Sequence, residues 1–195
     1  LPGSCGCYAL ADILFGAVNP SGRLPMSMPY CSGQLPLSYA AFQTGRPKPQ
    51  WDGFYPFVSN YMDVPNVPLY PFGYGLSYGE VSYSPVSLDN VVLTADGAIR
   101  ASVTVENRGE LPVREAVQLY IRDVKGSVVR PMRELKGLQK ISLAPGESKT
   151  VSFTITEEML RFYDIDMNFV SEPGDFMLWI GHDSLTENGA AFRLA

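Results

Sequence analysis

The chain has little of the residue types on which most metal sites depend. Its 195 residues include one histidine and three cysteines. Three cysteines are too few for a disulfide scaffold. A zinc site would need a fourth ligand, and His182 lies far along the sequence from Cys5, Cys7 and Cys31. We therefore expect thiols that are buried or have no function, and we expect the chain to bind neither a metal nor a cofactor.

Charged residues and long apolar runs are also scarce. Charged residues make up 18% of the chain and the formal net charge is −5, with no large cluster of lysine and arginine. We therefore expect no nucleic-acid partner. No run approaches the roughly 18 apolar residues that a membrane-spanning helix needs, so we expect no membrane partner. The hydrophobic content of 46% is that of a folded globular protein.

From about residue 80 onward, apolar and polar residues alternate with the period of a half-buried strand. The clearest runs are 99–106, 117–122, 151–156 and 176–180, and glycine-containing turn signals separate them. Several short strands with such turns predict a mainly β fold, a two-sheet sandwich of the immunoglobulin or fibronectin type III kind. A single helical turn is expected at 157–162.

The residues before position 80 have a different character. Residues 4–16 carry a helical stripe of apolar side chains, with Ser4 as the expected N-cap and Gly16 as the expected stop. Residues 23–28 are expected to form a short strand. Residues 30–75 hold too many prolines for a helix or a central strand. They also hold many aromatic residues, so we expect a long irregular loop that packs over a surface.

Short motifs, in order along the chain, carry a resemblance to a known family. The chain resembles glycoside hydrolase family 3, in particular bacterial β-glucosidases. The motifs are Pro2-Gly3-Ser4, Asn19-Pro20-Ser21-Gly22-Arg23-Leu24-Pro25, Tyr70-Pro71-Phe72-Gly73-Tyr74-Gly75-Leu76-Ser77-Tyr78, Arg130-Pro131 and Leu143-Ala144-Pro145-Gly146-Glu147.

The resemblance implies a division near residue 79. Residues 1–79 would be the end of the family's C-terminal α/β sandwich domain together with a linker loop. Residues 80–195 would be a fibronectin type III-like domain. The resemblance also favours a periplasmic or extracellular location.

The resemblance further implies an activity for the whole enzyme. The family hydrolyses β-linked glucosides and xylosides with retention, which requires two carboxyl groups about 5–5.5 Å apart. Family members carry both groups upstream of the matched motifs. We therefore assign no catalytic residue to this chain and expect it to be inactive alone. Its expected partner is the remainder of the same enzyme, namely the N-terminal barrel and the rest of the α/β domain. The whole enzyme would bind a β-glycoside substrate.

Two segments depart from the family pattern. The family usually reads Pro-Gly-Ser/Thr-Glu-Gly-Gly-Asn where this chain has Cys5-Gly6-Cys7-Tyr8 after Pro2-Gly3-Ser4. This is either a diverged pocket edge or an error at the end of a partial sequence. The chain also has Ser59-Asn60-Tyr61 where close relatives often have Ser-Arg-Tyr. This difference argues against a sugar contact by this loop.

Four residues of the long loop are candidates for substrate binding. Trp51, Tyr55 and Tyr61 offer the flat apolar faces on which a pyranose ring stacks. Arg46 offers a guanidinium that can hydrogen-bond a sugar or a carboxylate. The alternative is that all four anchor the loop to the protein surface.

Other groups have structural interpretations. Gly73 and Gly75 lack the third glycine of a phosphate loop, so they indicate close packing at the domain junction. His182 has no triad partner at a suitable spacing and is expected to be structural. Several acidic residues crowd the C-terminal third, where they fit turns or a weak calcium site: Asp164, Asp166, Glu172, Asp175 and Asp183.

The sequence also fits two other interpretations. The chain could be a free-standing β-sandwich that binds carbohydrate or serves in adhesion. It could also pair with a separately encoded N-terminal half.

Overall fold

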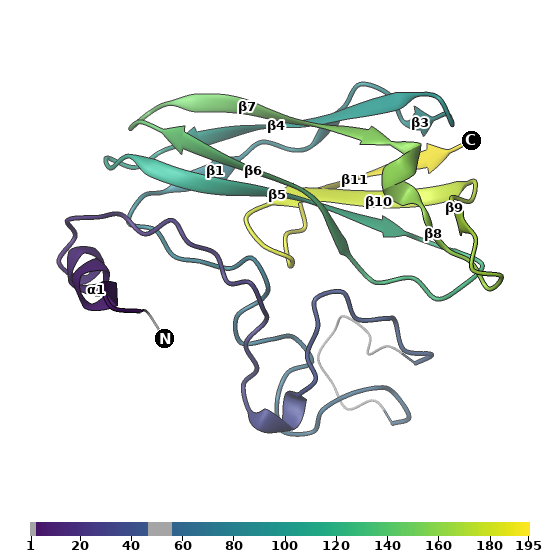
Figure 1. The fold of residues 1–195 in the computed structure, drawn as a ribbon, viewed down its shortest axis with the longest axis horizontal. Coiled ribbons are helices and arrows are strands. Elements are labelled where there is room, and N and C mark those ends of the chain that lie inside the picture. Colours follow the sequence, from purple (N-terminus) through teal and green to yellow (C-terminus); the bar gives the residue numbers. More distant parts are fainter. Residues whose placement is uncertain (1–2, 47–55) are drawn as a thin grey trace.

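The computed structural model describes residues 3–46 and 56–195. Two layers of strands stack face to face, and the N-terminal part of the chain runs beneath them (Figure 1). This is the predicted mainly β architecture, so the fold class is confirmed. Within the described residues, no helix is both long enough and apolar enough to cross a membrane.

The first sheet is built around one long strand. Strand β4 (Ala98–Asn107) pairs with β7 (Ser148–Thr156) along nearly its whole length. The short strands β1 (Val81–Tyr83) and β2 (Ser87–Leu88) pair with its other edge. All of these pairs are antiparallel.

The second sheet has five strands in the order β3-β11-β10-β5-β6. They are β3 (Val92–Leu93), β11 (Gly189–Leu194), β10 (Gly174–Gly181), β5 (Val113–Asp123) and β6 (Glu134–Leu143). The β3–β11 pair is parallel and the others are antiparallel.

A short excursion joins the two sheets. The 3-10 turn η2 (Glu157–Leu160) confirms the helical turn expected after β7. A small hairpin follows it, formed by β8 (Phe162–Tyr163) and β9 (Phe169–Val170).

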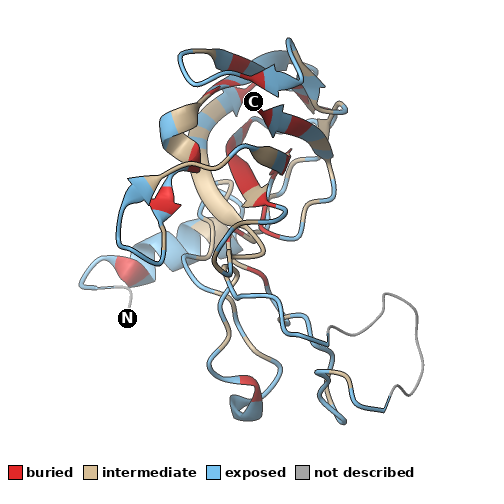
Figure 2. Cartoon of the chain, turned by 90° about the vertical axis from the view of Figure 1, so that its right-hand side faces the viewer, coloured by how far each residue is buried: buried red, intermediate tan, exposed pale blue. Residues whose placement is uncertain are grey.

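The core lies between the two sheets. Alternate residues of β4 face inward, and Ile99, Ala101 and Val105 have no exposed surface. From the opposite sheet, Leu119 and Leu178 are equally buried. Burial is concentrated in the sandwich, while most of the N-terminal part is exposed (Figure 2). The core therefore follows the period-two pattern of the sequence.

The outer face of strand β5 is buried, although the alternating pattern predicts that it faces solvent. Gln118 and Tyr120 point away from the core, yet they are only 2% and 0% exposed. The Gln118 Nε2 donates to the carbonyls of Gly73, at 3.2 Å, and His182, at 2.5 Å. Its Oε1 accepts from the Tyr120 hydroxyl at 2.5 Å. The N-terminal part of the chain thus covers this strand.

Two aromatic rings and one glycine complete that cover. The Tyr39 ring stacks on Phe72 with centroids 4.1 Å apart and meets Tyr120 edge-on at 6.0 Å. Gly73 has a φ of +82°, and a Cβ there would overlap the Gln118 amide. The close packing predicted for this glycine is confirmed, and its conformation favours glycine as well.

Helix α1 (Gly6–Leu14) stands apart from the sandwich (Figure 1). The predicted helix is confirmed, but Cys5 occupies the N-cap and no side chain caps the helix, so the Ser4 cap was wrong. Leu14 and Phe15 are 69% and 89% exposed. All three cysteines of the chain are free and exposed, not buried.

The strand expected at 23–28 is not formed. The backbone of this segment instead meets residues 70–74 through separate hydrogen bonds, such as Leu24 N–H to Tyr74 O at 2.8 Å. Only one isolated bridge, Met28 to Tyr70, has strand geometry. Pro25 and Pro71 have no N–H to donate, which interrupts a regular ladder.

A buried ion pair ties the N-terminal part to the sandwich. The Arg23 Nη2 lies 2.6 Å from the Glu115 Oε2, and the two side chains are 12% and 4% exposed. The Tyr83 hydroxyl donates to the other Glu115 oxygen at 2.8 Å. Burial, reinforced by the Glu115 charge, raises the pKa of Tyr83, which therefore stays a neutral donor.

Breaking this pair is expected to destabilise the protein. Arg23→Met would leave a buried carboxylate without its cation and lower the free energy of unfolding by about 3–5 kcal/mol. Arg108→Met is the matched control, because the Arg108–Glu106 pair is largely exposed and should contribute less than about 1 kcal/mol. Urea denaturation followed by circular dichroism measures both, and equal losses would contradict the assignment.

Candidate functional site

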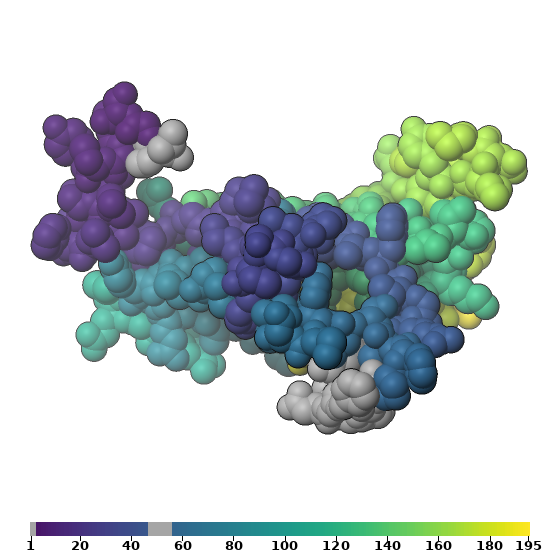
Figure 3. Space-filling model, turned by 90° about the horizontal axis from the view of Figure 1, so that it is seen from below, coloured from purple at the N-terminus to yellow at the C-terminus, as the bar shows by residue number. Residues whose placement is uncertain are grey.

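The candidate site lies in the part of the chain that projects from the sandwich. We call residues 30–46 and 56–70 the projecting segment. It extends below the sheets in Figure 1 and stands toward the viewer in Figure 3. Apart from the 3-10 turn η1 (Ser32–Gln34) and isolated bridge positions at residues 42, 59 and 70, its described residues have no regular structure, as predicted.

The projecting segment is held together by one buried amide. Gln34 is 0% exposed. Its Oε1 accepts from the Tyr30 backbone N–H at 2.6 Å, and its Nε2 donates to the Pro65 carbonyl at 2.7 Å. Two stretches that are about 30 residues apart in sequence are therefore joined through a single side chain.

A second amide closes the base of the loop. Asn66 Oδ1 accepts from the Tyr61 N–H at 3.0 Å, and its Nδ2 donates to the Ser59 carbonyl at 2.9 Å. The Ser59 N–H in turn donates to the Arg46 carbonyl at 2.8 Å. These bonds connect the two ends of the 46–59 loop.

The structure locates two of the four predicted sugar contacts. Arg46 is exposed at one end of the loop, and its backbone carbonyl is used in loop closure. Tyr61 is 37% exposed, and its hydroxyl donates to the Gln34 carbonyl at 3.2 Å. The loop base thus brings Arg46 and Tyr61 into one bonded network. Trp51 and Tyr55 lie outside the described residues.

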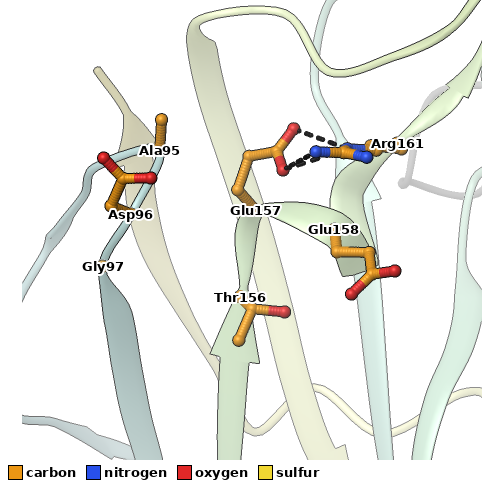
Figure 4. A pocket seen from close by; sticks show the side chains of 7 residues that line it. All are labelled: Ala95, Asp96, Gly97, Thr156, Glu157, Glu158 and Arg161. Atoms are coloured by element: carbon orange, nitrogen blue, oxygen red, sulfur yellow. Dashed lines mark hydrogen bonds and ion pairs between the residues drawn. The ribbon is translucent and has the colours of Figure 1, made fainter.

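A hollow of about 480 Å³ opens beside η2 and is lined by Asp96, Glu157, Glu158 and Arg161, among others. Arg161 faces Glu157 in a two-oxygen ion pair, and the Glu158 carboxylate is directed away (Figure 4). Hydrogen bonds from Arg161 and then from Ser171 lower the pKa of Glu157. A general acid of a glycosidase needs a raised pKa, so Glu157 is poorly suited to that role.

A second hollow, of about 250 Å³, lies between Gln43–Thr44 and residues 122–130. Asp123 is the one carboxylate in its lining. Burial raises the pKa of Asp123, but a retaining glycosidase needs a second carboxylate opposite the first. The second hollow therefore does not offer the pair that acetal hydrolysis requires.

His182 is exposed and paired with its neighbour. Its Nε2 lies 3.3 Å from the Asp183 carboxylate, and this hydrogen bond raises the pKa of the imidazole. Its backbone carbonyl accepts from Gln118, so the residue takes part in covering β5. In the described part of the chain, no group of three or more histidine, cysteine or acidic side chains is placed to hold a metal ion.

Sequence reasoning missed the residues that organise the projecting segment. Gln34 stands in a short motif of the family resemblance, Gln34-Leu35-Pro36, which gave it no role of its own, while Asn66 and Gln118 are isolated amides. Their importance depends on burial and on partners up to 64 residues away. Only an indirect signal pointed to such residues. An aromatic-rich loop that packs on a surface has buried backbone groups, and polar side chains must supply their hydrogen-bond partners.

Comparisons with known proteins place this geometry in a family. Residues 1–78 match the model of the glycosyl hydrolase family 3 C-terminal domain, and residues 115–184 match that of the fibronectin type III-like domain. The chain is 46% identical to the periplasmic β-glucosidase of Salmonella typhimurium over 98% of its own length and 25% of that protein. It is 39% identical to a β-xylosidase of Formosa agariphila over 92% of its length and 24% of that protein.

A solved structure shows the same arrangement. The β-glucosidase of Listeria innocua in complex with glucose superimposes with a TM-score of 0.94 and 38% identity, over 100% of this chain and 27% of that one. The chain thus spans about a quarter of the length of the relatives that it matches. By sequence and fold it belongs to glycoside hydrolase family 3, where it corresponds to the C-terminal part of a β-glucosidase-like enzyme.

Proposed function

We propose that this chain is the supporting C-terminal part of a retaining glycoside hydrolase that acts on β-linked glucosides or xylosides. The main support for the proposal is the order of the two parts of the chain. They match the two family models one after the other, and together they align with a β-glucosidase about four times as long. The catalytic carboxylates would be supplied by the remainder of the same enzyme.

The chemistry of the described surface supports this division of labour. The hollow beside η2 holds Glu157 with a lowered pKa and an engaged ion pair. The hollow beside β5 holds one carboxylate. Retention needs a protonated acid that faces an ionised nucleophile, and neither the single carboxylate of the second hollow nor the ion-paired Glu157 of the first fits that need.

We also propose that the chain consists of two units, residues 1–79 and 80–195. The first strand of the sandwich begins at Val81, and the first family match ends at residue 78. The unit 80–195 holds every residue of the hydrophobic core found among residues 3–46 and 56–195, while Gly73 and Arg23 of the first unit pack against its outer face.

The projecting segment would place sugar contacts at the rim of the active site. Arg46, Trp51, Tyr55 and Tyr61 are the proposed contacts. The proposal is supported by the exposure of Arg46 and by the partly exposed ring of Tyr61, whose hydroxyl is already engaged. Tyr61 would therefore offer its ring face to a pyranose, while Arg46 would offer hydrogen-bond donors.

The isolated chain is expected to be inactive. The purified 195-residue polypeptide should release no p-nitrophenol from p-nitrophenyl β-glucoside above the buffer background, because it would lack a facing carboxylate pair. Calorimetric titration with β-glucan oligosaccharides should show no binding to the chain alone. Turnover would overturn the proposal. Tight binding without turnover would favour a free-standing carbohydrate-binding module, which the self-contained core of the sandwich could support.

A chimera tests the rim contacts. The 195 residues would replace the matching quarter of the Salmonella typhimurium β-glucosidase, which is 46% identical. We expect an active enzyme in which Arg46→Ala raises KM several-fold by removing one sugar contact, worth about 1–2 kcal/mol. Arg108→Ala, on an exposed turn of the sandwich, is the matched control and should leave KM unchanged. An unaltered KM in Arg46→Ala would remove Arg46 from the site.

A further inference from the structure

We propose that Gln34 is a positioning residue for substrate binding, because its buried amide fixes the loop base formed by Arg46, Ser59, Tyr61 and Asn66. This inference rests on the proposed function, in which the loop base borders the substrate. In this inference Gln34 touches no sugar and acts by holding the residues of the loop base in place.

The side chain of Gln34 uses both ends of its amide. The oxygen accepts from the Tyr30 N–H at 2.6 Å. The nitrogen donates to the carbonyls of Pro65, at 2.7 Å, and Val67, at 3.4 Å. With no exposed surface, the amide has no water to replace these partners. Losing any of them would leave a buried polar group unpaired, which is costly.

The bonds from Gln34 reach the loop base by two routes. The first runs through the turn at 65–67, whose Asn66 side chain bonds the Tyr61 N–H and the Ser59 carbonyl. The second is direct, since the Gln34 carbonyl accepts from the Tyr61 hydroxyl at 3.2 Å. Tyr61 is therefore fixed at its backbone by Asn66 and at its ring end by Gln34.

Arg46 is fixed through the same network. Its carbonyl accepts from the Ser59 N–H, and the Ser59 carbonyl accepts from Asn66. A shift of the 65–67 turn would therefore move both candidate contacts together. Loss of Gln34 should weaken substrate binding without altering groups that react, which predicts a change in KM at nearly constant kcat.

Only an amide satisfies this position. Glutamate would present acceptors to two carbonyls that need donors, and it would bury a charge. Methionine has a similar length and no strong donor or acceptor, so Gln34→Met removes the hydrogen bonds while keeping most of the packing.

The first measurement uses the 195-residue chain itself. Hydrogen exchange resolved by NMR would compare Gln34→Met with Gln139→Met, a matched control in the sandwich, whose half-buried side chain on β6 donates to the Ser152 carbonyl of β7. We expect the Ser59 and Tyr61 amides to exchange about tenfold faster in Gln34→Met only. Amides of β5 and β10 should be unchanged in both variants, which would show that the sandwich remains folded. Unchanged exchange at Ser59 and Tyr61 would overturn the proposal.

The second measurement uses the chimeric enzyme. We expect Gln34→Met to raise KM about tenfold with kcat within about twofold, and Gln139→Met to change neither. Asn66→Ala, which cuts the same network at an exposed residue, should reproduce the rise in KM. Faster exchange in the chain with an unchanged KM would overturn the role in substrate binding. An inactive chimera carrying native Gln34 would instead count against the proposed function, and the exchange measurement would still decide whether Gln34 fixes the loop base.

Discussion

The burial of one amide, that of Gln118, is the constraint on which the arrangement of the whole chain depends. An outward-facing glutamine in an antiparallel sheet normally reaches water, and a buried one must find protein partners. Here the partners are the carbonyls of Gly73 and His182 and the hydroxyl of Tyr120. Two of these partners belong to the sandwich, and Gly73 belongs to the N-terminal part, so the amide is both fully paired and buried when the N-terminal part is docked on β5.

The other contacts of the N-terminal part extend from this point along β5 and β6. Arg23 pairs with Glu115 near one end, and Arg122 donates to Gln43 near the other. Tyr39, between them, stacks on Phe72. The N-terminal part is thus attached along one face of the sandwich.

Much of the sandwich could be predicted, because the alternation in β4, β7 and β10 directly reflects a local geometric rule. Strand β6 gave a weaker pattern, since its outer residues are partly covered and Gly137 interrupts it. The outer face of β5 was predicted wrongly, because the burial of Tyr120 depends on Tyr39, which lies 81 positions earlier. In the described part of the candidate site, the sequence singled out Arg46 and Tyr61, whose contact with sugar stays a prediction. Gln34 belongs to a motif of the family resemblance, Gln34-Leu35-Pro36, but the motif gives it no role, because its amide bonds a partner about 30 residues away.

The central claim is that residues before position 80 complete the outer face of the sandwich. The most direct test compares the urea-induced unfolding of residues 80–195 alone with that of the whole chain. The account predicts a folded sandwich with its core intact, but with a free energy of unfolding lower by at least the roughly 3–5 kcal/mol expected for Arg23→Met, because Tyr120 and the Gln118 amide also lose their cover. Equal stability of the two polypeptides would contradict it.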